Sequence, residues 1–122
     1  MNIKEYSNKP VKVFGPKNFG KVEINQLLSV DYKSRINIQG SIDSEVLNIN
    51  NKMKELIDKE IFVDTLELFC GSNATYCPLF VHQDQLITYD GRHLTKYGAR
   101  FLGREMLKQQ RFKDLLKFES LP

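Results

Sequence analysis

An aspartate and a histidine stand three residues apart in the stretch YDGRHLTKYGA, which runs from Tyr89 to Ala99. A histidine acts as a general base when a carboxylate fixes its tautomer and its ring orientation. Asp90 is close enough in sequence for its oxygen to reach Nδ1 of His93 across a tight turn, and Gly91 makes such a reversal sterically easy. The spacing therefore favours an acid–base pair. The alternative is that both side chains only satisfy backbone groups where a helix begins.

The elements on either side of this pair would hold it at the edge of a sheet. Residues Pro78 to Asp90 resemble two short strands about the polar turn His82 to Gln85. After Thr95, which suits an N-cap, the apolar residues recur at helical spacing. The apolar face of this predicted helix carries Leu94, Gly98, Phe101, Leu102 and Met106. The opposite face carries Arg100, Arg104 and Lys108. A loop between a strand end and a helix start is a common place for an active site in α/β proteins.

The remaining chain predicts further strands and one more helix. PVKVFGP (Pro10 to Pro16) is typical of a short strand that runs into a loop, whereas residues 17–40 are poorly periodic. From Ser41 an amphipathic helix is expected, with Ser41 or Asp43 as N-cap. Its apolar stripe comprises Ile42, Val46, Ile49, Met53, Leu56 and Ile57. Glu60 to Cys70 is interpreted as a strand. Strands alternating with helices predict a layered α/β fold with a largely parallel sheet.

Length and composition indicate one ordinary globular domain. The chain has 122 residues, of which 41% are hydrophobic and 27% charged, with a net charge of +3. No apolar run approaches the roughly 18 residues of a membrane span, and the N-terminal stretch lacks the apolar region of a signal peptide. Arg100 to Lys117 is rich in basic residues, which we interpret as the solvated face of a terminal helix. No nucleic-acid partner is therefore expected.

The stretch around the Asp–His pair resembles the final sequence block of the SGNH hydrolases and esterases. The similarity is greatest to the SGNH domains fused to membrane-embedded acyltransferases that O-acetylate bacterial surface polysaccharides. Those domains typically end in D-x-x-H-L-[ST]-x-x-G-A, and DGRHLTKYGA matches every fixed position. VKVFGP resembles the family's strand that ends in a Gly-Pro pair, and FVDTLELFC followed by LITYD resembles the run before the Asp–His block. The resemblance covers about residues 10–107.

The resemblance implies an SGNH-like (flavodoxin-like) three-layer fold and Ser-His-Asp chemistry on acyl esters. By position, Asp90 would be the orienting acid and His93 the general base, while Leu94 and Thr95 would pack and cap the following helix. It implies a glycan or acyl-ester substrate, with O-acetyl as the acyl group, and no cofactor or metal. It also implies a domain on the extracytoplasmic side, attached to a membrane only through a region outside this chain.

The nucleophile of such a triad is missing from this sequence. The family's serine lies in an N-terminal Gly-Asp-Ser block, and one of its oxyanion donors lies in a Gly-x-Asn-Asp segment; neither segment occurs here. The serines present lack that setting: Ser7, Ser29, Ser34, Ser41, Ser44, Ser72 and Ser120. We therefore interpret residues 1–122 as one domain, the C-terminal portion of an SGNH domain. Its partner would be the missing N-terminal part or a second chain, and whether this chain is itself an enzyme stays open.

Two cysteines, Cys70 and Cys77, enclose the turn-forming stretch GSNATY. The resemblance implies that this pair forms a disulfide, as a similarly placed pair does in the related domains. For so short a loop, the bond would raise the free energy of unfolding by roughly 2–3 kcal/mol in the chain-entropy model. Free thiols are an alternative, and so is a zinc site with His82 and His93, although that spacing matches no standard zinc pattern.

A different class of function is also compatible with these residues. In a small non-catalytic α/β binding or interaction domain, Asp90 and His93 would be structural, and an exposed sheet edge or the basic terminal helix would contact a partner. Nucleic-acid binding through this helix has only weak support, because the net charge is mild and no recognised motif is present.

Overall fold

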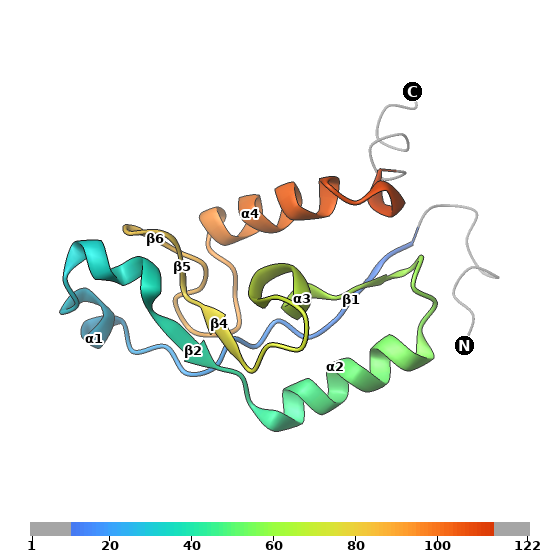
Figure 1. Cartoon of the computed structure of the whole chain (residues 1–122), viewed down its shortest axis with the longest axis horizontal. Coiled ribbons are helices and arrows are strands. Elements are labelled where there is room, and N and C mark those ends of the chain that lie inside the picture. Colours follow the sequence, from blue (N-terminus) through green and yellow to red (C-terminus); the bar gives the residue numbers. More distant parts are fainter. Residues whose placement is uncertain (1–10, 114–122) are drawn as a thin grey trace.

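The computed structural model describes residues 11–113 and shows a mixed α/β arrangement of short strands and helices (Figure 1). The strands are β1 (Val13–Phe14), β2 (Gln39–Ser41), β3 (Phe62–Val63), β4 (Tyr76–Pro78), β5 (Phe80–His82) and β6 (Gln85–Leu86). The helices are α1 (Ile24–Leu28), α2 (Ser44–Leu56), α3 (Thr65–Cys70) and α4 (Lys96–Leu107), with 3-10 helices η2 (Tyr32–Asn37) and η3 (Gln110–Phe112). In Figure 1, α2 and α4 run along opposite sides, with β1 and α3 between them. Among residues 11–113, no helix is long and apolar enough to cross a bilayer.

The strands of the described region form three two-stranded sheets. β1 and β3 are parallel, as expected for strands joined by a crossover that contains α2. β2 pairs with β4 and β5 pairs with β6, both antiparallel. The expected α/β character is therefore present, but parallel pairing within residues 11–113 is limited to β1 and β3.

The expected strand from Glu60 to Cys70 is wrong over most of its length. β3 covers only Phe62–Val63, and α3 begins at Thr65. Asp64 separates the two, because its Oδ1 accepts a hydrogen bond of 3.0 Å from the backbone N–H of Glu67 and caps the helix. Short apolar runs do not distinguish a buried strand from a buried helix by periodicity alone, and here the cap decides.

The predicted helix after Ser41 is confirmed as α2, with Asp43 as its N-cap. The Asp43 carboxylate accepts from the N–H of Glu45 at 3.1 Å. Not all residues of the predicted apolar stripe are buried, since the exposed fraction is 53% for Ile49 and 84% for Leu56. Its buried residue is Asn50, whose Nδ2 donates to Oδ1 of Asp64 at 3.0 Å.

The predicted helix after Thr95 is confirmed as α4 together with its cap. The Thr95 hydroxyl accepts from the N–H of Gly98 at 3.1 Å. Gly98, Leu102 and Met106 are buried, as the apolar face predicts. Gly98 allows a close approach, because a Cβ there would lie 2.4 Å from the carbonyl oxygen of Ile87. This contact sets α4 directly against the segment that follows β6.

Residues of α3 and α4 contribute to the hydrophobic core, where three aromatic rings contact one another in a row. Phe69 meets the fully buried Phe19 edge-on, with ring centroids 5.1 Å apart, and stacks on Phe101 at 5.4 Å. Phe19 belongs to the poorly periodic region, so its place in the core depends on contacts distant in sequence.

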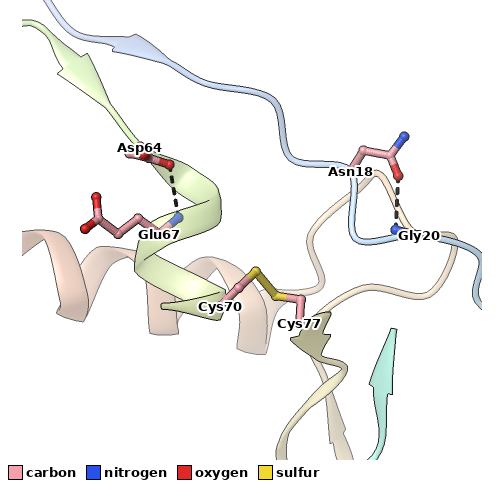
Figure 2. The surroundings of a disulfide bond; sticks show 6 residues. All are labelled: Asn18, Gly20, Asp64, Glu67, Cys70 and Cys77. Atoms are coloured by element: carbon pink, nitrogen blue, oxygen red, sulfur yellow. Dashed lines mark hydrogen bonds between the residues drawn. A yellow bond between two sulfur atoms is a disulfide. The ribbon is translucent and has the colours of Figure 1, made fainter. Parts of the chain in front are cut away.

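Cys70 and Cys77 form a disulfide that joins the end of α3 to β4 (Figure 2). Both sulfur atoms are used in this bond, so neither cysteine is a free thiol or a thiolate ligand for zinc. Because β4 pairs with β2, the disulfide also connects α3 to the segment from Gln39 to Ser41.

Candidate active site

Asp90 and His93 contact each other directly. Oδ2 of Asp90 lies 2.6 Å from Nδ1 of His93. The second oxygen, Oδ1, accepts from the backbone N–H groups of Arg92 at 2.9 Å and His93 at 2.8 Å. The two interpretations of this motif are therefore compatible, since one carboxylate oxygen orients the imidazole while the other stabilises the turn.

These hydrogen bonds hold the pKa of Asp90 well below its usual range. The largest cause is the backbone N–H of His93, followed by the His93 side chain and the backbone N–H of Arg92. Each donor stabilises the charged carboxylate. An aspartate whose pKa falls on folding contributes stability above its ordinary pKa of about 3.9, and this contribution is lost as the pH drops through the lower folded value. At neutral pH the imidazole therefore faces an ionised carboxylate.

The turn that carries this pair is held from inside by Thr88 and Gly91. Thr88 is completely buried, and its hydroxyl accepts from the N–H of Gly91 at 2.9 Å. Gly91 has a φ of +86°, which L side chains rarely adopt. A Cβ on Gly91 would lie 2.0 Å from the carbonyl oxygen of Gly20. This turn thus requires glycine both for its backbone angle and for its close neighbour.

The loop between β1 and α1 is fastened to the same turn. The N–H of Phe19 donates to the carbonyl of Gly91 at 2.8 Å. Lys17 Nζ donates to the carbonyl of Arg92 at 3.0 Å. Asn18 lies between these contacts, and its Oδ1 accepts from the N–H of Gly20 at 3.1 Å (Figure 2). Segments that are distant in the sequence therefore form one rigid surface beside His93.

This surface forms an open cleft of about 710 Å³. It is lined by Asn18, Gly20, Lys21, Ser41, Asp43, Asp90, Arg92 and His93. The His93 side chain is 67% exposed, and no hydrogen bond to Nε2 is present within residues 11–113. With Nδ1 turned to Asp90, Nε2 is the nitrogen that can accept a proton from a group in the cleft.

The serines in the described region are not arranged as a nucleophile for this histidine. Ser41 lines the cleft, but no hydrogen bond joins its side chain to His93. Ser72, in the stretch CGSN, donates instead to the Glu67 carboxylate at 2.7 Å, as a polar turn would. His82, the second histidine of the chain, does not line this cleft. Ser7 and Ser120 lie outside the described residues.

The sequence did not single out Asn18, Lys21 and Arg92 as residues of this site. The Gly-Pro pair at the end of β1 marks the loop that carries the first two, but nothing local in this loop indicates that it returns to the Asp–His turn. The hydrogen bond from Lys17 to Arg92 spans a separation of 75 residues. A contact of this kind has no signature within a short window of sequence.

A histidine oriented by an ionised aspartate, at the turn before a helix in an α/β fold, has the geometry that general-base chemistry requires. The chain belongs to the family of SGNH domains fused to AT3 domains, whose family model matches residues 3–108. This match confirms the resemblance indicated by the sequence and makes the domain hydrolase- or esterase-like. Comparison with curated proteins and with solved structures gave no match.

Proposed function

We propose that this chain supplies the general base and the orienting acid for serine-ester chemistry on O-acyl groups, specifically O-acetyl groups of a bacterial envelope polysaccharide. The observation that carries the proposal is the 2.6 Å contact between Oδ2 of Asp90 and Nδ1 of His93, a histidine that lines an open cleft. Membership in the family of SGNH domains fused to AT3 domains supports the reaction class.

In the reaction we infer, His93 Nε2 removes the proton of a serine hydroxyl as the serine oxygen attacks the acyl carbonyl carbon. The ester C–O bond then breaks, the leaving glycan alkoxide takes the proton from the imidazolium, and the acyl group remains on the serine. In the second half of the reaction, His93 removes a proton from a water or an acceptor hydroxyl, whose oxygen attacks the acyl-serine. The acyl–serine bond then breaks and the serine oxygen takes the proton back, so the acyl group passes to water in hydrolysis or to the acceptor in transfer. Asp90 stabilises the imidazolium throughout.

The serine would come from a segment outside these 122 residues, the missing N-terminal part of the domain or a partner chain. Exposed apolar side chains support this view. Phe14 on β1 is 48% exposed, and Ile49 and Leu56 on α2 are exposed as well. Within the described residues, β1 pairs only with β3. We infer that the serine-bearing segment packs here and extends β1 and β3 into the larger parallel sheet of a three-layer domain.

The disulfide supports an extracytoplasmic location for this domain. Structural disulfides persist in oxidising compartments and are rare in the cytosol of most organisms. Cys77 is fully buried, which protects the bond to Cys70 from solvent. We propose that the domain faces the cell-surface or periplasmic side, and that any attachment to a membrane is made by an AT3 region outside this chain.

The proposal is tested by assaying p-nitrophenyl acetate hydrolysis and fluorophosphonate labelling. The full chain is measured alone and together with a separately produced serine-bearing segment of an SGNH domain. We expect rates near background for the chain alone, because no serine of this sequence lies in the family's Gly-Asp-Ser setting. The mixture should hydrolyse the ester and become labelled on serine, and His93→Ala should lower its rate by about 10²–10⁴-fold.

The matched control is Asp31→Asn, since Asp31 is exposed and makes no side-chain cap hydrogen bond at the start of η2. This variant should react like wild type. A mixture that hydrolyses and labels equally well with His93→Ala would show that His93 is not the base.

A further inference from the structure

A second groove, which shares no residue with the cleft, lies between α4 and the β5–β6 hairpin. Its volume is about 200 Å³, and its lining residues are His82, Gln85, Tyr97, Arg100 and Arg104. His82 ends β5 and Gln85 begins β6. The other three residues belong to α4 at separations of three and four, so their side chains share one face of the helix.

The groove contains two arginines and a histidine without an acidic partner. Among the described residues, no carboxylate forms an ion pair with Arg100, Arg104 or His82, and Asp84 in the hairpin turn is no exception. By contrast, some lysines elsewhere in the described region form ion pairs, for example Lys108 with Glu105 at 2.7 Å. The positive charge in this groove is therefore not neutralised by the described part of the molecule.

The two walls of the groove are held at a defined separation. The backbone N–H of Thr95 donates to the carbonyl of Ile87 at 2.9 Å, and its hydroxyl donates to the carbonyl of Leu86. Gly98 contacts the backbone of Ile87, and Leu102 of the same helix is buried in the core. The start of α4 is thus fixed against the hairpin, and the arginines extend from a rigid element. A rigid site loses less entropy on binding a ligand.

The chemistry of these side chains fits an oxyanion. A guanidinium group presents a planar set of donors that matches a carboxylate or a phosphate in bidentate geometry. Two guanidinium groups one helical turn apart can bind the same anion or adjacent anions. Gln85 and Tyr97 add an amide and a hydroxyl, which can hydrogen-bond to neutral neighbours of the charged group.

We propose that this basic groove binds the carboxylate or phosphate group of an acidic polysaccharide. That the anion belongs to a glycan rests on the proposed function, whereas binding of the anion does not. A small concave site fits a single charged group better than it fits a flat membrane surface. The net charge of +3 is also low for a protein that binds nucleic acid or lipid through charge.

The test is an NMR titration of the full ¹⁵N-labelled chain with two probes, inorganic phosphate and an oligogalacturonate. We expect saturable shifts at Gln85, Tyr97, Arg100 and Arg104. Arg100→Gln and Arg104→Gln should each weaken binding of both probes by about tenfold, the loss of one charge-assisted interaction. Lys52→Gln, an equal change of charge on the exposed surface of α2, should leave the affinity within about twofold.

Two outcomes would overturn the groove as an anion site: no saturable shift with either probe, or an equal loss of affinity in Lys52→Gln. The same titration is repeated with a neutral acetylated oligosaccharide, a single-stranded oligonucleotide and anionic vesicles as comparison ligands. Tighter binding of the oligonucleotide or the vesicles than of the oligogalacturonate would reject the glycan. Binding is measured without hydrolysis, so a failure of the esterase proposal and a failure of this inference are observed separately.

Discussion

At the scale of single residues, Asp90 serves the backbone and the imidazole at once. Oδ1 closes the turn through two backbone N–H groups, and Oδ2 holds Nδ1 of His93. A carboxylate can do both because it offers two oxygens and only accepts hydrogen bonds. The short D-x-x-H spacing thus makes a structural and a chemical contribution with the same side chain.

Asp90→Asn should change the tautomer of His93. Asparagine can still accept from the backbone through its oxygen, but its amide nitrogen would donate to Nδ1 and move the imidazole proton to Nε2. Long-range ¹H–¹⁵N NMR at pH 8 should show unprotonated Nε2 in wild type and protonated Nε2 in the variant. In the complemented site the rate should fall on the order of 10⁴-fold. An unchanged tautomer would mean that Asp90 does not orient the ring.

At the scale of elements, the site depends on two loops that fit together through glycine. Gly20, with a φ of +89°, and Gly91 lie against each other without side chains, and the N–H of Phe19 donates to Gly91. The hydrogen bond from Phe19 to Gly91 joins two backbone groups, so its geometry depends on the path of the chain, and the Lys17 side chain adds a second link to the carbonyl of Arg92. α4 then continues from this turn through the Thr95 cap.

Gly91→Ala should destabilise the protein by about 2 kcal/mol or more, because alanine is strained at this φ and its Cβ would collide with the Gly20 carbonyl. Gly103→Ala is the control, since a Cβ in the middle of α4 meets nothing within 4 Å. That change should stabilise the protein by about 0.5–1 kcal/mol. Urea denaturation followed by circular dichroism measures both; equal effects would contradict the close packing of the two loops.

At the scale of the whole molecule, long-range links hold together a set of short elements. β3 has two residues and α3 has six, so neither is stable without its neighbours. The Cys70–Cys77 disulfide joins α3 to β4, and Phe69 connects the same helix to Phe19 and Phe101. Stability of this fold is therefore expected to depend on the redox state of its surroundings.

Replacing both cysteines by serine should lower the free energy of unfolding by about 2–3 kcal/mol, according to the chain-entropy model. Urea denaturation with and without dithiothreitol separates loss of the bond from the cost of a hydroxyl at the buried position of Cys77. Reductant should lower the midpoint of wild type and leave that of the double variant unchanged. A wild-type midpoint that is insensitive to complete reduction would contradict a stabilising role.

The sequence by itself determined the features that depend on residues three or four apart. The Thr95 cap, the buried face of α4 and the D-x-x-H spacing are of this kind, because one turn of chain brings their atoms together. The resemblance to the family was most specific in the same local block, and the family model that confirms it matches residues 3–108. The Asp64 cap that divides the Glu60 to Cys70 run into a strand and a helix is also local, although the apolar pattern of that run hid it. Tertiary structure alone decided that the loop with Asn18 joins the cleft. Tertiary structure also brought His82 to the arginines of α4. Contacts of this kind could not be predicted, because they join segments whose separation in the chain leaves no periodic pattern in the sequence.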